Sequence, residues 1–357
     1  MLRSGRRRVA CFAGKARRSR DQQGDVGMPE IPLIDIAPFR LGSDDDRQRT
    51  ARAFGAAFEQ VGFAAIAGHG VADALAARAH AAAAEFFALP TADKMAAAIP
   101  ERIKVRGYMP FGIESVARTY AGETPPDLCE ALVFSAMHLD PDGAPPGVSA
   151  ATGNIVPARP ADLFAAYRAY FLAMRELSGL LFRLAALALD LSEGHFGPHV
   201  DRRRGKLRTV HYPEQPVAPL PGQLRYGAHT DFGSLTILRQ DDALGGLQAQ
   251  FKTGEWVDVR PTPGTFVVNA GDLMARWTND RWRSGVHRVI NPPRDAHGST
   301  RRVSLVFFSE VNEDAMIECL PTCHSAANPA KYPPISAEAH RLRKIDISMP
   351  PEMAVPS

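Results

Sequence analysis

The sequence lacks long apolar runs and has few cysteines, and each absence excludes a class of protein. No stretch of the chain approaches the roughly 18 consecutive apolar residues of a membrane-spanning helix, so an integral membrane protein is not expected. The four cysteines, Cys11, Cys129, Cys319 and Cys323, are scattered, which predicts reduced thiols and a cytoplasmic location. Pro321 interrupts the CxxxC pair at 319 and 323 and no second pair follows, so a zinc site is not predicted.

Excess charge of one sign is also missing from most of the chain. The formal net charge is +3, but residues 1–27 contain eight Lys/Arg and two Asp, which leaves −3 for residues 28–357. Without a basic surface, no nucleic-acid partner is expected. The leader, residues 1–27, has neither an apolar signal segment nor hydrophobic periodicity, and we expect it to be disordered or an upstream extension.

The rest of the chain changes character at about residue 204. Before it, short strands alternate with alanine-rich helical segments, the helices being expected over 72–88 and 160–191. After it, short β-type runs recur between Gly, Pro, Asn and Asp: LRTVHY, SLTILRQ, GLQAQF, EWVDVR, TFVVNA, LMARWT, GVHRVI and RVSLVFFSE. Closely spaced short strands of this kind predict a sandwich or barrel. The predicted fold is mainly β with flanking helices: a double-stranded β-helix (jelly-roll) barrel with a mixed α/β N-terminal part.

This map divides the chain into five expected regions. A leader covers 1–27, an N-terminal region covers 28–160, and a buttressing helix covers 161–200. The jelly-roll core is expected over 201–312, with a C-terminal extension over 313–357.

The stretch YGAHTDFGS, residues 226–234, places a histidine and an aspartate two positions apart. In an extended strand, His229 and Asp231 point to the same face, which in a barrel is the interior. A buried carboxylate is costly unless it is paired or binds a metal. His287, in the later run SGVHRVI, offers a third ligand, and two histidines with one carboxylate form the facial triad of non-haem iron(II) oxygenases.

A second pair follows in the run RRVSLVFF. Arg302 and Ser304 are two positions apart, so on a strand they share one face. A guanidinium fork beside a hydroxyl is suited to binding a carboxylate through two parallel hydrogen bonds. We therefore expect this pair to hold the distal carboxylate of an oxo-acid.

The segments GAHTDFGSLTIL, GGLQ, VVNAGDLMARWTNDRWRSGVHRV and RRVSLVFF resemble the iron(II)/2-oxoglutarate-dependent dioxygenases of the isopenicillin N synthase-like family. The upstream segments IPLIDIAPF, GFAAIAGHGV and RGYMPFGIESVARTYAGETPPDLCEAL extend the resemblance over most of residues 29–325. It implies that His229, Asp231 and His287 ligate Fe(II) (Fe2+). It also implies that Arg302, Ser304 and Tyr212 bind the 5-carboxylate of 2-oxoglutarate.

Position 210 departs from the family pattern. The plant-type sequence has an asparagine two residues before the tyrosine at 212, where this chain has Val210. Asn269 and Asp272 match a family motif, and we expect them to orient the site rather than to bind metal.

The resemblance implies an oxygenase that uses O2 and 2-oxoglutarate to hydroxylate, desaturate or cyclise a small organic molecule, releasing succinate and CO2. Two alternatives stay within the family: an Fe(II) oxidase that does not use 2-oxoglutarate, and an ethylene-forming enzyme. A third, of another class, is a non-catalytic sensor that binds iron and an oxo-acid. The primary substrate and the oligomeric state are not predicted.

Three further residues carry weaker expectations. His138 begins a second HxD with Asp140, but PDGAPPG follows, which predicts an exposed loop. His211 adjoins Tyr212 on a strand and should face away from the site. Arg225 shares the parity of His229 and could meet an acidic substrate at the cavity mouth, although a solvated arginine at a strand end is the simpler interpretation.

Overall fold

The computed structural model describes residues 30–99, 106–202, 204–243 and 246–348, so the predicted leader lies outside the described residues. The helices are α1 Ala37–Leu41, α2 Asp44–Gln60, α3 Asp73–Phe87, α4 Thr91–Met95, α5 Arg118–Ala121, α6 Leu163–Ala188, α7 Gly197–Val200, α8 Asp272–Trp277 and α9 Ala337–Ser348, with a 3-10 turn at Met137–Leu139. The strands are β1 Leu33–Asp35, β2 Phe63–Ala67, β3 Gly107–Met109, β4 Glu130–Ser135, β5 Gly147–Val148, β6 Ile155–Val156, β7 Gly205–Tyr212, β8 Tyr226–His229, β9 Leu235–Gln240, β10 Leu247–Gln250, β11 Trp256–Asp258, β12 Phe266–Ala270, β13 His287–Val289, β14 Arg302–Ser309, β15 Met316–Ile317 and β16 Ile335–Ser336.

Two sheets form the barrel. In the described part of the chain, the large sheet has the order β1-β2-β12-β9-β14-β7-β4-β3, and the small sheet has the order β11-β10-β13-β8. The N-terminal strands therefore extend the large sheet instead of forming a sheet of their own. Only the β1–β2 ladder is parallel among the ladders of these two sheets. The predicted jelly-roll barrel with a mixed α/β N-terminal part is confirmed.

The large sheet has a core on each face, because side chains alternate along its strands. On the barrel side, Val210 and Val267 of the large sheet pack in one cluster with Leu247 and Val289 of the small sheet. On the outer side, residues such as Leu207, Ile237, Leu305 and Phe307 pack with the apolar faces of the helices. The barrel interior is thus closed off from the helical layer, and polar groups that enter it must come from strands and loops.

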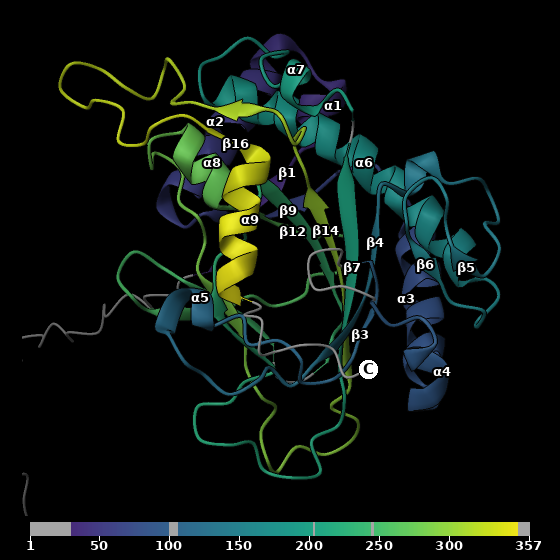
Figure 1. Cartoon of the computed structure of the whole chain (residues 1–357). Coiled ribbons are helices and arrows are strands. Elements are labelled where there is room, and N and C mark those ends of the chain that lie inside the picture. Colours follow the sequence, from purple (N-terminus) through teal and green to yellow (C-terminus); the bar gives the residue numbers. More distant parts are fainter. Residues whose placement is uncertain (1–29, 100–105, 203, 244–245, 349–357) are drawn as a thin grey trace, which may run out of the picture.

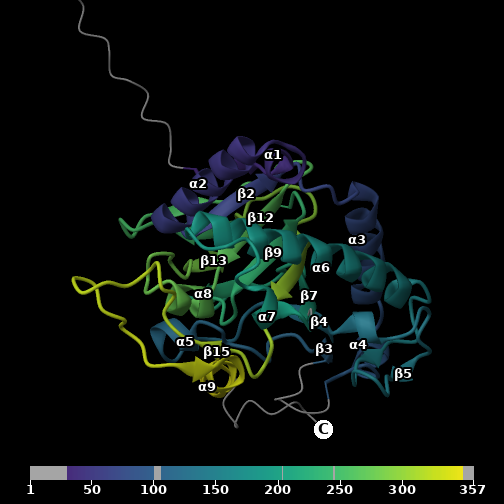
Figure 2. The same cartoon turned by 90° about the horizontal axis from the view of Figure 1, so that it is seen from above.

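Helices cover the outer face of the large sheet. The helix α6 contacts α2, α3 and the strands β7, β9 and β14. It begins at Leu163, three residues after the predicted start, so Pro160 precedes the helix instead of lying in its first turn. The helix α2 begins at a capping box in which the Ser43 side chain and Asp46 exchange hydrogen bonds. On the other side of the sheet, α9 lies beside α5 (Figures 1 and 2).

One predicted strand is wrong. The run LMARWT, residues 273–278, belongs mostly to the helix α8. Its buried residues Leu273, Met274 and Trp277 have helical spacing, and its first N–H groups donate to the loop after β8: Asp272 to Asp231 O at 2.8 Å and Leu273 to Gly233 O at 3.0 Å. Among the described residues, no helix combines the length and the apolar composition needed to cross a membrane.

Candidate active site

Two strands of the small sheet bring the two candidate histidines together. His229 is the last residue of β8 and His287 is the first of β13, and the two are register partners. Asp231 lies beyond the end of β8, so strand alternation alone does not set its direction. The backbone carbonyl of Asp231 accepts the N–H of Asp272, which holds this loop against the start of α8.

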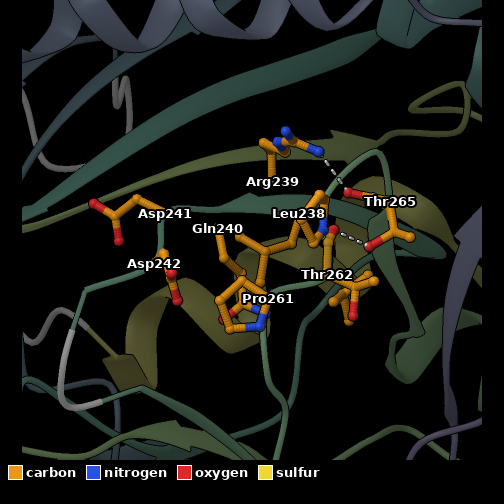
Figure 3. A pocket seen from close by; sticks show the side chains of 10 residues that line it. Leu238, Arg239, Gln240, Asp241, Asp242, Pro261, Thr262 and Thr265 are labelled. Carbon is orange, nitrogen blue, oxygen red and sulfur yellow. Dashed lines mark hydrogen bonds between the residues drawn. The ribbon is translucent and has the colours of Figure 1, made fainter.

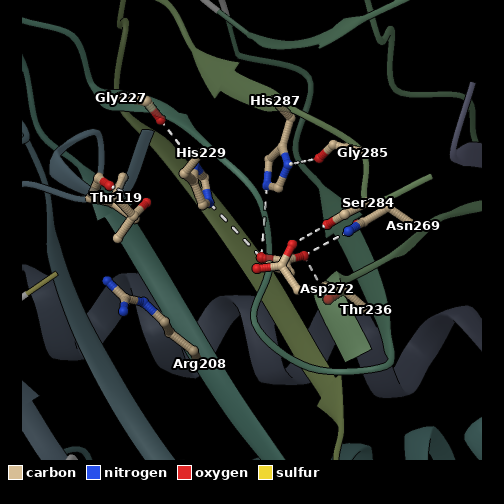
Figure 4. Close-up of polar contacts among 12 residues, drawn as sticks. Thr119, Arg208, Gly227, His229, Thr236, Asn269, Asp272, Ser284, Gly285 and His287 are labelled. Atoms are coloured by element: carbon tan, nitrogen blue, oxygen red, sulfur yellow. Dashed lines mark hydrogen bonds and ion pairs between the residues drawn. The ribbon is translucent and has the colours of Figure 1, made fainter. Parts of the chain in front are cut away.

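The three side chains converge on one point. Oδ1 of Asp231 lies 3.9 Å from Nε2 of His229 and 3.9 Å from Nε2 of His287. One ligand atom from each residue can be chosen so that all three lie within 4.8 Å of one another. Figure 4 shows the two imidazole rings pointing into the same space. The sequence-predicted triad is therefore assembled as a cluster that could hold a metal ion.

Backbone carbonyls orient both imidazole rings. Nδ1 of His229 lies 2.9 Å from the carbonyl oxygen of Gly227, and Nδ1 of His287 lies 3.0 Å from that of Gly285. Because a carbonyl only accepts, Nδ1 carries the proton in each ring and donates it, which leaves the Nε2 lone pair free. Burial, followed by the neighbouring His287, lowers the pKa of His229 well below its usual value. A neutral imidazole is the form that binds metal.

The carboxylate of Asp231 is held through its other oxygen. Oδ2 accepts hydrogen bonds from Oγ1 of Thr236 and from Nδ2 of Asn269, each at 2.6 Å. Burial raises the pKa of Asp231, but the two histidines and these two hydrogen bonds outweigh it and lower the pKa below its usual value. Asn269 thus contacts the site as the family motif implied. Sequence reasoning missed Thr236, although it is the register partner of Asn269 on the adjacent strand.

The candidate co-substrate residues lie on β7 and β14. Arg302 and Tyr212 are register partners, and Ser304 is the partner of Val210. All three candidate side chains are nearly inaccessible: Arg302 is 1% exposed, Ser304 4% and Tyr212 3%. Val210 and Tyr212 belong to the same apolar cluster. Where the plant-type sequence has a polar asparagine, this chain therefore has an apolar contact.

One of these buried groups, Arg302, has hydrogen-bonding capacity to spare. The Arg302 guanidinium donates through Nη2 to Oε1 of Gln240 at 2.7 Å, and its Nη1 lies 3.5 Å from Oδ1 of Asp241. Nε of Arg302 is buried without a partner among the described residues. A buried N–H without an acceptor, here that of Arg302 Nε, indicates that a polar ligand belongs beside it.

Arg225 is not a solvated arginine, which corrects the simpler of the two sequence interpretations. It is fully buried, its guanidinium lies 5.9 Å from the centre of the Tyr212 ring, and it donates to the carbonyl oxygen of Thr300. Burial, and second the charge of Arg302, lower the pKa of Arg225 to about 10. Two buried arginines thus lie near Tyr212, a positive environment that favours an anionic ligand.

The second HxD motif has a structural role, and its expected exposure is wrong for the aspartate. Asp140 is 2% exposed, and its carboxylate accepts hydrogen bonds from Ser149, Thr152 and Asn154. The His138 ring stacks on Phe171 of α6 and does not belong to the cluster of candidate metal ligands. These contacts organise the loop between β4 and β6.

His211 faces away from the triad, as expected from its neighbour. Its Nδ1 lies 2.7 Å from Oε1 of Glu130, and its ring stacks on Phe87 of α3. This places His211 on the helix-covered face of the large sheet.

Two surface cavities of the described part of the chain lie away from the triad. One cavity of about 280 Å3 is lined by residues 238–242, 261–263, 265 and 267 (Figure 3), and another of about 310 Å3 is lined by residues 214–216, 292–294, 296, 298 and 300. The first includes Gln240 and Asp241, both of which contact the Arg302 guanidinium. Neither cavity includes a triad residue. The candidate active site is therefore identified from the cluster of His229, Asp231 and His287 and not from a cavity.

Comparisons with known proteins agree with this geometry. The family described as "non-haem dioxygenase in morphine synthesis N-terminal" matches residues 31–158, and the "2OG-Fe(II) oxygenase superfamily" matches residues 204–311. The chain is 34% identical to a 2-oxoglutarate-Fe(II) type oxidoreductase of Emericella nidulans, with 86% of this chain and 87% of the relative covered. It is 31% identical to a homoarginine-6-hydroxylase of Oryza sativa subsp. japonica, covering 88% and 96%.

A solved structure shows the same fold. A full-length Neurospora crassa protein, crystallised in complex with alpha-KG and thymine, superposes with a TM-score of 0.77 at 30% identity, covering 88% of this chain and 96% of that one. The protein is accordingly an enzyme that uses Fe(II), 2-oxoglutarate and O2 to oxidise a small molecule. From its two matched regions and its relatives, the chain belongs to the 2-oxoglutarate/Fe(II) oxygenases of the isopenicillin N synthase-like family.

Proposed function

We propose that His229, Asp231 and His287 bind Fe(II), that Arg302, Ser304 and Tyr212 bind the distal carboxylate of 2-oxoglutarate, and that the enzyme hydroxylates a small organic substrate. The convergence of three ligand atoms, one on each of His229, Asp231 and His287, supports the proposal most directly. Two imidazole nitrogens and one carboxylate oxygen are the donor set suited to iron(II) with open positions for other ligands.

The surroundings of the triad support its fit to a metal. Both Nδ1 atoms are committed to backbone carbonyls, and Oδ2 of Asp231 is committed to Thr236 and Asn269. Among the described residues, Nε2 of each histidine and Oδ1 of Asp231 make no hydrogen bond of their own, so these atoms are available to a metal. A buried carboxylate next to two neutral imidazoles is compensated when a divalent cation joins them.

The chain's own residues have separable tasks in the proposed reaction. Arg302 and the two hydroxyls would bind and orient the co-substrate, and the apolar residues Val210 and Leu238 beside them would keep water away from it. Fe(II) with 2-oxoglutarate supplies O2-dependent oxidation, with release of succinate and CO2. The protein would hold the ligands in place and orient one position of the substrate toward the metal.

Hydroxylation is the proposed outcome because relatives are named for it. The curated relatives include a homoarginine-6-hydroxylase and a proline hydroxylase, and a validamycin A dioxygenase is 30% identical to this chain. Desaturation or ring closure would use the same residues.

The experiment is anaerobic reconstitution. The purified protein receives Fe(II) and then 2-oxoglutarate, and the visible charge-transfer band is recorded before O2 is admitted and succinate is measured. A band followed by succinate formation is expected. If the wild-type protein shows neither, or if the His229→Ala protein shows both at the wild-type level, the assignment is wrong.

The same assay separates the family alternatives. Succinate formed in proportion to the O2 consumed excludes an oxidase that takes all its electrons from the substrate. Ethylene in the headspace would identify fragmentation of 2-oxoglutarate itself. Tight binding of iron and 2-oxoglutarate without oxidised product across a broad substrate panel would favour the sensor.

We also propose that the enzyme works in a reducing compartment such as the cytoplasm. The three described cysteines, Cys129, Cys319 and Cys323, are free thiols, which supports this location. Mass spectrometry after alkylation of protein from freshly lysed cells tests it, and all three cysteines are expected to carry the alkyl label.

A further inference from the structure

A charged pair lies in the barrel beside the metal cluster. Arg208 is on β7, where it shares the barrel-facing side with Val210 and Tyr212. Its guanidinium lies 5.5 Å from the centre of the Tyr226 ring, and that ring meets the His229 ring edge-on at 4.9 Å. In Figure 4, Arg208 and Thr119 lie on the His229 side of the cluster. The arginine is therefore one aromatic ring away from a candidate ligand.

The partner of Arg208 comes from the loop between β3 and α5. Nη1 of Arg208 donates to Oε1 of Glu114 at 3.0 Å, and Nη2 donates to Oε2 of the same carboxylate. Two parallel hydrogen bonds of this kind fix both side chains in one plane. The side chains keep 11% and 14% exposure, so the pair is largely buried.

A third residue fastens this loop to the metal-binding strand. Asp127 accepts the N–H of Val116 through Oδ2 and the N–H of Gly227 through Oδ1, each at 2.8 Å. Gly227 is the residue whose carbonyl orients His229. Asp127 therefore links the loop that carries Glu114 to β8, the strand that carries the candidate ligand His229.

The guanidinium has a further donor to offer. Nε of Arg208 is buried and has no hydrogen-bond partner among the described residues. A buried N–H without an acceptor costs free energy, and a bound group that accepts from it recovers that cost. The pair thus presents donors on Arg208 next to acceptors on Glu114.

The charges indicate which group fits. Arg208 and Glu114 neutralise each other, so a substrate anion would lie beside the carboxylate of Glu114, and a substrate cation would lie beside the guanidinium. A charged substrate of either sign would thus contact a like charge in a site of low dielectric, and this contact is unfavourable. An uncharged amide meets neither, because its C=O accepts from arginine and its N–H donates to glutamate.

We propose that Arg208 and Glu114 form the substrate-recognition edge of this site, and that the substrate presents an uncharged amide-type group, such as a lactam, imide or ureide, to that edge. This proposal rests on the proposed function, since it takes the triad as the place where the substrate reacts. The group that is oxidised would be another part of the same molecule, turned toward the metal.

The experiment compares three five-membered-ring fragments that differ in charge: 2-pyrrolidinone, pyrrolidine as the cation, and cyclopentanecarboxylate as the anion. Binding to the Zn(II)-substituted protein with 2-oxoglutarate is followed by saturation-transfer NMR, which requires no turnover. We expect 2-pyrrolidinone to bind at least about tenfold more tightly than either charged fragment. Equal binding of a charged fragment, or no binding of 2-pyrrolidinone at its solubility limit, would overturn the proposal.

Variants test the two residues directly. In Glu114→Gln the arginine keeps its charge and loses its counter-ion, so the preference should change toward cyclopentanecarboxylate by about tenfold. The double variant Arg208→Gln/Glu114→Gln removes both charges and leaves two side-chain amides that can hydrogen-bond to each other. It therefore leaves no unpaired buried charge and provides a second test if Glu114→Gln does not fold. Arg239→Met is the matched control, because Arg239 lies on β9 and donates to Thr265 O outside this pair. In the double variant neither charge remains, so the advantage of 2-pyrrolidinone over the charged fragments should fall below about tenfold. An unchanged ranking in Glu114→Gln together with an unchanged advantage in the double variant would also overturn the proposal.

The charge-transfer band with Fe(II) and 2-oxoglutarate is recorded for every protein. If the wild type lacks the band, the proposed function has failed. If the band is present and the fragment ranking is absent, only the recognition by Arg208 and Glu114 has failed.

Discussion

His229 and His287 are opposite one another in the neighbouring strands β8 and β13, and the centres of their rings lie 4.1 Å apart. Backbone pairing in the small sheet therefore sets the spacing of two candidate ligands. The register between these strands shifts just after this pair, so the ladder is locally irregular beside the metal cluster. Only the third ligand, Asp231, depends on a loop for its position.

Replacement of His229 by alanine should abolish iron binding. Since loss of a residue that merely orients a ligand lowers metal affinity about 10–100-fold, loss of the ligand itself should exceed that. Fe(II) titration followed by the charge-transfer band measures the effect. His138→Ala is the matched control, because it removes the histidine of the other HxD motif, and iron affinity equal to wild type is expected. A comparable loss in the control would mean that the two motifs had been assigned wrongly.

Asn269→Ala should weaken metal binding while the triad remains intact. The change removes one of two hydrogen bonds to Oδ2 of Asp231, and the expected loss of metal affinity is about 10–100-fold. Thr236→Val removes the other and should act in the same direction. Asn291→Ala serves as the control, because Asn291 bonds to Gln215 and Gln223 away from the triad. Competition with a metal-sensitive dye gives the affinities, and wild-type affinity in both site variants would contradict the role.

Arg302→Lys should raise the Kd for 2-oxoglutarate without changing iron affinity. A lysine keeps the charge but loses the fork that binds a carboxylate twice, and a lost charged hydrogen bond of about 1.5–3 kcal/mol corresponds to about 10–100-fold. Ser304→Ala should cause a smaller increase. Titration of the charge-transfer band with 2-oxoglutarate measures both. If Arg302→Lys binds the co-substrate as wild type does, another residue, with Arg225 first among the alternatives, holds the carboxylate.

Glu130 should make the fold sensitive to acid. Burial raises its pKa, but hydrogen bonds from His211, Lys94 and Tyr108 outweigh burial, so the pKa lies below the usual 4.5. A carboxyl group with a lowered pKa contributes stability that is present above its unfolded pKa and is lost as the pH falls through its folded pKa. Urea unfolding of the wild type from pH 7 downward should show the free energy of unfolding decline below about pH 4.5.

Glu130→Gln tests this contribution. The variant leaves Lys94, which is 7% exposed, without its counter-ion, and the free energy of unfolding at pH 7 should fall by about 3–5 kcal/mol. Its dependence on pH in the acid range should be flatter than that of wild type. Glu338→Gln removes a pair with Arg341 whose side chains are about one-third exposed, and it should change stability by less than about 1 kcal/mol. Similar losses in the two variants would show that Glu130 has no special role.

Local patterns allowed the barrel and the ligand residues to be predicted. Alternation of apolar side chains marked strands such as β7, β12 and β14, because a strand repeats every two residues. The same period placed Arg302 and Ser304 on one face and turned His211 away from Tyr212. The α8 helix was missed because six residues are too few to distinguish helical spacing from a short apolar strand.

Long-range contacts were decided only by the tertiary structure. The sequence by itself determined the kinds of donor, the strands that carry most of them and, through family resemblance, the reaction class. It did not predict that Glu114 would meet Arg208 across 94 residues, that Thr236 would share the carboxylate with Asn269, or that Arg225 would be buried beside Tyr212. Those contacts depend on the order and register of strands and on how loops close over them. Burying a charged or polar group costs free energy unless a partner compensates it, and no local sequence pattern shows which distant residue that partner will be.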